Sequence, residues 1–323
     1  MTRVAAVIPH WNRRDLLAAL LENLGQQTRA FDEIIVVDNG STDGSAEWAE
    51  KSGARVIRMK ENRGFAAAVN RGIDATVCDL VAILNNDVTL DREWVARILE
   101  GVGDAWFACG KILCATDDAK VDGAFDEVSR AGCPLRCGSG KPDSSYWNQR
   151  RKIRVAPMTA AMFRRDLFQE VGTLDERFES YLEDVDFGIR CAAAGKAGVY
   201  IPEAVCRHIG SATRGAWNSD TVYLLSRNQV LLVDKYLRWQ SMLTILVGQL
   251  LWGVVALRHR RGLAWLRGKI SGLRVIRNSG EDFANQQLSL PSIFESSEEA
   301  ILDVQRHTGF DWYWRSYFWL LRR

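Results

Sequence analysis

Short β-branched runs of apolar residues alternate with stretches of helical periodicity along the first two thirds of the chain. We expect strands at residues 4–9, 33–38, 54–59, 80–87, 105–113, 158–165 and 197–202. Strands that alternate with helices are typical of a mostly parallel sheet with helices on its faces. The pattern therefore predicts an α/β fold around a mostly parallel, Rossmann-like central sheet.

The first predicted helix follows directly after the first strand. Its apolar side consists of Leu16, Leu17, Leu20, Leu21 and Leu24, which share one helical face. Asn12 stands where an N-cap residue would satisfy the first free backbone N–H groups.

Residues 114–155 interrupt this alternation, because they are rich in Gly, Asp, Ser and Arg and contain few apolar runs. We interpret them as a long loop over one end of the sheet, of the kind that often serves as a lid or binding loop. Its basic and aromatic residues suit sugars and phosphates, so we expect it to cover an acceptor: Arg136, Lys141, Tyr146, Trp147, Arg150 and Arg151.

The composition changes from residue 239 onward. An apolar stretch at 242–257 precedes a basic stretch, with seven Lys or Arg and no acidic residue from Arg258 to Arg277. Half of the 12 tryptophans lie in 239–323. This order is typical of an interfacial membrane anchor, although a helical hairpin packed on the main domain, or an oligomer interface, fits as well. We therefore expect two units, residues 1–238 and a helical extension at 239–323.

Composition and charge exclude some classes of protein. The net charge of +2 over 323 residues gives no overall field that would favour nucleic acid. The seven cysteines are scattered, mostly in apolar runs, which favours reduced buried thiols in a cytoplasmic protein over disulfides or a zinc site. We expect neither an export signal nor a transmembrane segment.

Polar residues gather where predicted strands end. Pro9–Asn12 ends the first strand, Asp38-Asn39 the second and Asn85-Asn86-Asp87 the fourth. Ligands of open parallel sheets bind at these carboxyl ends, where a carboxylate can accept hydrogen bonds from a nucleobase or ribose. Asp87 could also hold Mg²⁺ or Mn²⁺ on a diphosphate, but each stretch fits a polar turn or a helix cap equally well.

The sequence YLEDVDFGIR at 181–190 places Glu183, Asp184 and Asp186 among apolar neighbours. Capping the start of a helix explains one or two of these carboxylates. Three of them in apolar company favour at least one general base. Further along the chain, His208 ends another predicted strand.

These motifs stand in an order that resembles the family 2 inverting glycosyltransferases with a GT-A fold. The similar segments are PHWN, VDNGSTDGS, NRGFAAAVNRG, LNND, TAAMFRRDLFQEVGTLDERFESYLEDVD and RHIGSAT, which together cover about residues 4–235. Within the family, the branch of bacterial rhamnosyltransferases and galactofuranosyltransferases is the most similar. The chain departs from the pattern at Trp11, where Tyr is usual, at Ala68, where Gly is common, and in having one metal-binding aspartate rather than two.

The resemblance implies roles for individual residues. Asp184 would be the general base, with Glu183 and Asp186 positioning donor and acceptor. Asp87 and His208 would hold a divalent metal, Mg²⁺ or Mn²⁺. The nucleotide-sugar would be bound by Pro9, Trp11, Asn12, Asp38, Asn39, Gly64, Phe65, Asn70, Asn85 and Asn86.

The resemblance also implies the reaction and its partners. The enzyme would transfer a sugar, with rhamnose the first guess, from a nucleotide-diphosphate sugar to a glycan or lipid-linked acceptor. This would occur in cell-surface polysaccharide synthesis at the inner face of the cell membrane. The alternative is a non-catalytic relative that binds nucleotide-sugar or glycan in an assembly. A nucleotidyltransferase fits less well, because IPHWNRRD lacks the glycines of its phosphate loop.

Overall fold

The computed structural model describes residues 2–210, 217–237, 240–279 and 290–322. Its strands are β1 (Val4–His10), β2 (Glu33–Asp38), β3 (Arg55–Arg58), β4 (Leu80–Leu84), β5 (Val88–Leu90), β6 (Phe107–Cys114), β7 (Asp117–Gly123), β8 (Asp126–Val128), β9 (Pro134–Arg136), β10 (Arg151–Ile153), β11 (Ala160–Arg164) and β12 (Gly198–His208). Its α-helices are α1 (Arg14–Leu24), α2 (Ser45–Lys51), α3 (Phe65–Asp74), α4 (Trp94–Val102), α5 (Arg165–Val171), α6 (Glu183–Ala193), α7 (Ser219–Tyr236), α8 (Met242–Arg258), α9 (Gly262–Ser279), α10 (Leu290–Thr308) and α11 (Trp312–Leu320).

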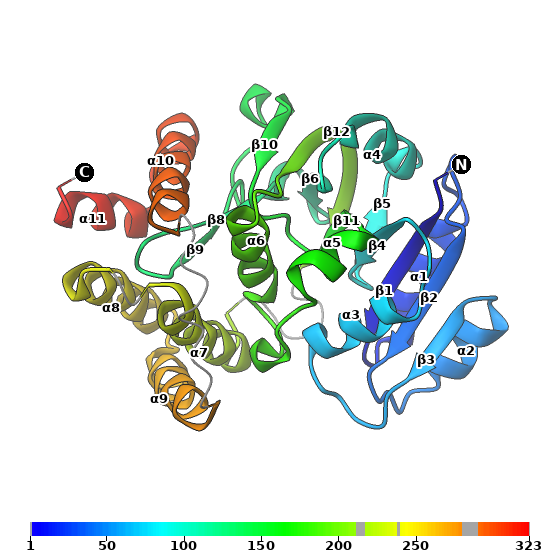
Figure 1. Ribbon diagram of the computed structural model, residues 1–323, viewed down its shortest axis with the longest axis horizontal. Helices are drawn as coiled ribbons and strands as arrows, with labels where there is room; N and C mark the ends of the chain where they lie inside the picture. The colour runs from blue at the N-terminus through cyan, green and yellow to red at the C-terminus, as the bar shows by residue number, and fades with distance from the viewer. Residues whose placement is uncertain (1, 211–216, 238–239, 280–289, 323) are drawn as a thin grey trace.

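A ten-stranded sheet forms the centre of the molecule (Figure 1). Its main path runs β10-β12-β6-β11-β4-β1-β2-β3, with β5 beside β12 and β7 beside β6. Pairs β1–β2, β1–β4, β2–β3 and β6–β12 are parallel, whereas β11 lies antiparallel between β4 and β6. The predicted α/β fold with a mostly parallel sheet is therefore confirmed, with β11 as an antiparallel insertion.

The core lies on both faces of this sheet. Along β1, Val7 belongs to one apolar cluster and Ala6 and Ile8 to another, as the alternation of side chains in a strand requires. Helix α1 buries Leu16, Leu17, Leu20 and Leu24 as predicted, with Leu21 partly buried.

The predicted N-cap of α1 was wrong. Arg13 occupies the N-cap position and its own side chain makes no capping bond, while the Asp43 carboxylate accepts from the Arg14 N–H at the first position of the helix. Asn12 is instead used between strands: its backbone N–H donates to Ser41 Oγ, and its side-chain oxygen accepts from the Thr42 N–H. Asn12 thus ties the end of β1 to the loop after β2.

The prediction of a long loop at 114–155 was also wrong. The segment contains β7, β10 and the two-stranded sheet β8–β9, and most of residues 121–133 are buried. Its apolar residues are separated by acids and glycines, so they form no run that marks a strand. Val121 and Phe125 are buried against the main sheet, whereas Ala131 and Cys133 are buried by helices distant in the sequence.

The C-terminal helices provide that cover. Ser297 of α10 donates to the buried Glu127 of β8, and Glu298 of the same helix pairs with Arg130. In Figure 1, α8 to α11 lie on the side of the molecule away from β3. No helix in the described part of the chain is long and apolar enough to span a lipid bilayer. The division between residues 238 and 239 lies at the edge of the described residues and stays a prediction.

Candidate active site

A cavity of about 550 Å³ opens at the carboxyl ends of the parallel strands. It lies where β1, β4 and β12 end, beside the start of α6 and the β7–β9 segment. Most of the residues proposed from the sequence line it: Pro9, Trp11, Asn39, Gly64, Phe65, Asn85, Asn86, Asp87, Glu183, Asp184 and His208. Residues up to 200 positions apart in the sequence thus share one site, which fits the rule for ligands of open parallel sheets.

Two proposed nucleotide ligands lie beside this cavity without lining it. The Asp38 carboxylate is buried and accepts a hydrogen bond from the Ser41 N–H. Asn12 holds the same loop, as described above. Both residues therefore stabilise the loop after β2 through hydrogen bonds.

Asn70 and Asp186 also point away from the cavity. The Asn70 amide bonds both the N–H and the C=O of Leu174. Asp186 is fully buried, and its carboxylate pairs with Arg190 and Lys235 and accepts from the Tyr236 hydroxyl. The third acid of the 181–190 stretch therefore attaches α6 to α7.

Asp87, His208 and Asp122 form a chain of contacts along one wall of the cavity. His208 Nε2 lies 3.2 Å from an Asp87 oxygen, and Nδ1 lies 2.9 Å from an Asp122 oxygen. Burial lowers the pKa of His208, but the bonds to the two carboxylates outweigh it and raise that pKa to about 9. The imidazole is therefore fixed in orientation by an acid on each side.

Glu183 and Asp184, at the start of α6, also line the cavity. Burial raises the pKa of both carboxyl groups, and the charge of Asp184 raises that of Glu183 further. Arg136 lies 3.7 Å from an Asp184 oxygen and counteracts the rise at Asp184. One Glu183 oxygen is buried without a hydrogen-bond partner. The geometry thus distinguishes Asp184, which faces a cation, from Glu183, which does not.

Arg136 is shared between two acids. Its guanidinium also pairs with Asp126, and burial raises the pKa of that carboxyl to about 6. Arg136 donates further to the Thr159 hydroxyl. The Arg136 guanidinium therefore links three parts of the cavity: α6, the β8–β9 sheet and the segment before β11.

The backbone that delivers Glu183 and Asp184 is strained. Glu179, Tyr181 and Leu182 all have positive φ angles, 59°, 71° and 69°, which side chains with a Cβ rarely adopt. The fully buried Asn228 of α7 holds this turn, because its amide nitrogen lies 2.6–2.9 Å from the carbonyl oxygens of Phe178, Ser180 and Tyr181. The start of α6 is thus fixed from α7.

The same turn touches the other wall of the site at Gly64. A Cβ on Gly64 would lie 2.6 Å from the Glu179 carbonyl oxygen, and its φ of 88° also requires glycine. The Asn39 amide donates to the Gly64 carbonyl. The N-terminus of α3 and the turn before α6 are therefore built as one unit.

Sequence reasoning assigned no site role to several cavity residues, among them His10, Asp122, Asp126 and Thr159, and it did not pair Arg136 with Asp184. His10 Nδ1 lies 2.9 Å from the Asn86 amide nitrogen. The spacing of Asp122 and Asp126 was a usable signal, because two acids four residues apart within VDGAFDEV stand among small and apolar neighbours. Only the position of β7 and β8 brings these acids to His208 and Arg136.

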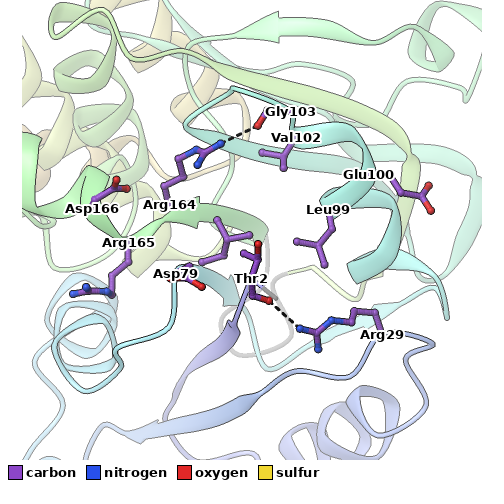
Figure 2. Close-up of a pocket in the computed structure, with 11 residues that line it drawn as sticks. Thr2, Arg29, Asp79, Leu99, Glu100, Val102, Gly103, Arg164, Arg165 and Asp166 are labelled. Carbon is purple, nitrogen blue, oxygen red and sulfur yellow. Dashed lines mark hydrogen bonds between the residues drawn. The ribbon is translucent and has the colours of Figure 1, made fainter.

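A second cavity, of about 830 Å³, lies at the opposite end of the strands, where β1 and β4 begin (Figure 2). Two of its three arginines are engaged by the protein itself, whereas the Nε of Arg165 is buried without a hydrogen-bond partner. Arg164 donates to the carbonyls of Gly103 and Ala105, and Arg29 to Thr2 and Asp32. We therefore place the candidate active site in the cavity at the carboxyl ends.

Two residues fit the metal that the sequence implied. Within the described ranges, no three His, Cys, Asp or Glu residues form a metal-binding group. Asp87 and His208 nevertheless present an oxygen and a nitrogen 3.2 Å apart, about the spacing of neighbouring ligands in an octahedral site with bonds near 2.1 Å. Asp122 on the far nitrogen is the outer carboxylate that metal-binding histidines usually have.

Comparison with known proteins identifies the family. The model of glycosyl transferase family 2 matches residues 5–172, and that of glycosyl transferase family group 2 matches residues 143–277. The chain belongs to glycosyl transferase family 2. It is 28% identical over 222 residues to the N-acetylglucosaminyl-diphospho-decaprenol L-rhamnosyltransferase of Mycobacterium tuberculosis, covering 59% of this chain and 71% of that protein. It is 27% identical over 194 residues to a PGL/p-HBAD biosynthesis glycosyltransferase of Mycobacterium bovis, covering 57% and 68%.

Solved structures confirm the GT-A fold. A mannosyltransferase from Pyrobaculum calidifontis in complex with GDP-Man and Mn²⁺ superposes with a TM-score of 0.53 at 17% identity, over 98% of this chain and 85% of that one. GalNAc-T7 with UDP, GalNAc and Mn²⁺ gives a TM-score of 0.66 at 13% identity, over 96% and 58%. At these identities the likeness establishes the fold alone.

Proposed function

We propose that this glycosyltransferase is an inverting enzyme that moves a sugar from a nucleotide-diphosphate donor to a lipid-linked acceptor. The observation that carries the proposal is the pairing of two walls in one cavity. Asp184 beside Arg136 forms one wall, and Asp87 beside His208 forms the other. One wall suits a proton acceptor and the other suits a leaving diphosphate.

In this proposal Asp184 is the general base. Its carboxylate takes the proton of the acceptor hydroxyl while that oxygen attacks the anomeric carbon, and the bond from this carbon to the diphosphate oxygen breaks. One displacement inverts the anomeric configuration. Burial raises the pKa of Asp184, and the positive charge of Arg136 favours the ionised carboxylate by counteracting this rise. Glu183, with one unpartnered oxygen, is placed to position the substrates.

Asp87 and His208 would hold a divalent cation, and Asp122 would keep the His208 ring in orientation. When bound, such a cation neutralises the charge of the departing diphosphate. The loop tied by Asn12 and Asn39, together with Trp11 and Phe65, would surround the nucleotide.

The relatives suggest the sugar and the acceptor. The Mycobacterium tuberculosis relative is named for an L-rhamnosyl transfer to a decaprenol-linked diphosphate sugar. We propose a similar reaction here, with rhamnose as the first donor sugar to test, in cell-surface polysaccharide synthesis. A lipid-linked acceptor would place the enzyme at the inner face of the cell membrane. A non-catalytic binding role is disfavoured because Asp184, Asp87 and His208 all face one cavity.

Nucleotide binding measured by calorimetry tests the proposal. We would titrate dTDP, UDP, GDP and CDP, with and without Mn²⁺ or Mg²⁺, into wild type and Asp87→Ala. The exposed Asp166→Ala, remote from this cavity, is the matched control. We expect one nucleotide to bind only with metal and to weaken at least about tenfold in Asp87→Ala. Binding of no nucleotide would overturn the proposal, and metal-independent binding would overturn its metal component.

The donor found in this way allows the reaction itself to be tested. Transfer to a synthetic polyprenyl-diphosphate sugar, followed by NMR of the product, reports the anomeric configuration. Retention of configuration would contradict the single displacement.

A further inference from the structure

Helices α8 and α9 expose many of their large apolar residues to solvent, which is unusual for surface helices. The positions that α8 buries are Thr244, Gly248, Gly253 and Ala256. Those that α9 buries are Ala264, Gly268 and Gly272. Surface helices of globular proteins usually place their large apolar residues inward. Here small residues stand at the closest contacts with the protein, and the larger inward residues, such as Leu251 of α8 and Val275 of α9, are only partly buried.

The close approach is visible at three glycines. A Cβ on Gly248 would lie 2.3 Å from the Ala131 side chain. On Gly268 and Gly272 it would lie 2.4 Å and 2.7 Å from backbone oxygens of α7. The inner faces of both helices are therefore fully used by the protein.

The large apolar side chains point outward instead. On α8 these are Met242, Leu243, Leu246, Leu250, Val254 and Leu257, which are 40–67% exposed. On α9 they are Leu263, Leu266, Ile270 and Leu273, which are 43–62% exposed. Both sets recur every three or four residues and so form one stripe along each helix. We call these two stripes the α8–α9 face.

Arginines accompany the α8–α9 face. At about 100° per residue, Arg267, Arg274 and Arg277 project on the same side of α9 as Leu266 and Ile270. Arg258 and Arg260 are exposed at the junction of the two helices. The sequence has no Asp or Glu from Ser241 to Ser279. The face therefore combines exposed apolar surface with positive charge, and neither helix contributes an acidic residue to it.

We propose that the α8–α9 face docks on the surface of an anionic lipid bilayer, with the helices in the plane of the interface. Leucine and isoleucine side chains enter the boundary of the acyl chains, and the arginines reach the anionic headgroups. A second copy of the chain is a poorer occupant. A two-fold interface would set these arginines against one another without an acid in either stripe to pair with them.

This inference deepens the proposed function, because a lipid-linked acceptor and a docked enzyme would share one surface. Its test requires no sugar transfer, so the two proposals fail separately. Suppose that wild type and Asp184→Asn bind vesicles equally well but that wild type transfers no sugar. The docking surface would then be supported and the proposed function contradicted.

The experiment is flotation of the full-length protein with vesicles of phosphatidylcholine, with or without phosphatidylglycerol. The apolar variant is Leu246→Gln/Leu250→Gln/Leu266→Gln/Ile270→Gln. Val77→Gln is its control, because Val77 is 72% exposed on the main domain. The charge variant is Arg267→Gln/Arg274→Gln, with exposed Arg92→Gln as its control.

We expect wild type to float with anionic vesicles and to partition at least about tenfold less onto neutral ones. The apolar variant should lose about tenfold or more on anionic vesicles. The charge variant should lose roughly fivefold for each arginine on anionic vesicles only. Both controls should float like wild type, and thermal unfolding should show that every variant is folded.

Two results would overturn the inference. One is wild type that floats with neither composition, or an apolar variant that floats like wild type. The other is sedimentation velocity that shows a wild-type dimer converted to monomer by the apolar variant, without vesicle binding by either. That result would assign the α8–α9 face to a second copy of the chain.

Discussion

The active-site cavity and the α8–α9 face differ from ordinary proteins in opposite ways. The cavity buries charged groups, and the α8–α9 face exposes large apolar ones. In the cavity, Glu183 and Asp184 are carboxyl groups that are almost fully buried. On the α8–α9 face, leucines such as Leu243 and Leu257 are about two-thirds exposed. Burying a charge and exposing a large apolar group both cost free energy in water.

The comparison shows how each cost points to a partner. In the cavity, part of the cost is offset inside the protein, because Arg136 lies beside Asp184 and carboxylates hold His208. The rest suits a substrate that brings a hydroxyl and a diphosphate. On the α8–α9 face the described protein does not cover the outer leucines, because both helices pack on it through their opposite sides.

The largest effect is expected from removing the base in the cavity. Asp184→Asn keeps the shape and the bond that the Asp184 side chain accepts from the Val185 N–H, but it cannot take the acceptor proton. We expect kcat to fall by about 10² to 10⁴. Nucleotide affinity measured by calorimetry should stay unchanged. An Asp184→Asn enzyme with more than a tenth of the wild-type kcat would exclude this base.

A second prediction concerns the outer carboxylate of His208. Asp122→Asn keeps a side chain of the same size but removes the negative charge at Nδ1. Metal-dependent nucleotide binding should weaken by about 10- to 100-fold, as for other outer partners of metal ligands. Asp118→Asn is the control, because Asp118 is exposed and pairs with Arg207 outside the cavity. If both variants gave the same metal titration, Asp122 would have no role in metal binding.

A third prediction tests the strained turn before α6. Asn228→Ala removes the amide that holds the carbonyls of Phe178, Ser180 and Tyr181. We expect a loss of about 1–3 kcal/mol in urea unfolding and a kcat reduced about tenfold with little change in the donor KM.

The control for this turn is Gln229→Ala. Gln229 is also buried in α7, but it bonds Lys269 rather than the turn. It should lose stability without losing kcat. If kcat fell equally in both variants, measured well below their melting temperatures, Asn228 would have only a general structural role.

A smaller effect is expected in the pH profile. Because burial raises the pKa of Asp184, the acid limb of kcat/KM should lie above that of an exposed aspartate. The base must be ionised, so activity should rise as pH passes upward through this pKa. Arg136→Gln removes the charge that lowers it and should move the limb to higher pH. A limb that moved to lower pH would contradict the assigned contact.

The fold and half of the site were accessible from the sequence for a physical reason. Asp38, Asp87 and His208 directly follow or end apolar strands, so the rule for parallel sheets places them at one edge. The start of α6 at Glu183 was likewise predicted and is confirmed. By contrast, Asp122, Asp126 and Arg136 reach the site only through the pairing of β7 with β6 and of β8 with β9. The spacing of the two acids marks them in the sequence, but no local pattern identifies their partners.

The sequence could not distinguish the three acids at 183–186 either. They lie within one helical turn, and only the position of α7 separates them. Lys235 and Tyr236 of α7 bind Asp186, whereas Asp184 faces Arg136. Asn70 also required the structure, because its partner Leu174 is about 100 residues away.

The contact between α10 and the β8–β9 sheet has a consequence for recombining this enzyme with its relatives. Glu127 is fully enclosed, and Ser297 of α10 donates a hydrogen bond to it. A chimera joined near residue 238 would leave Glu127 facing a foreign helix. A truncation there would leave Glu127 without α10 and without the Ser297 hydroxyl. The β8–β9 sheet and α10 therefore form one unit for exchange between family members, because buried contacts join them.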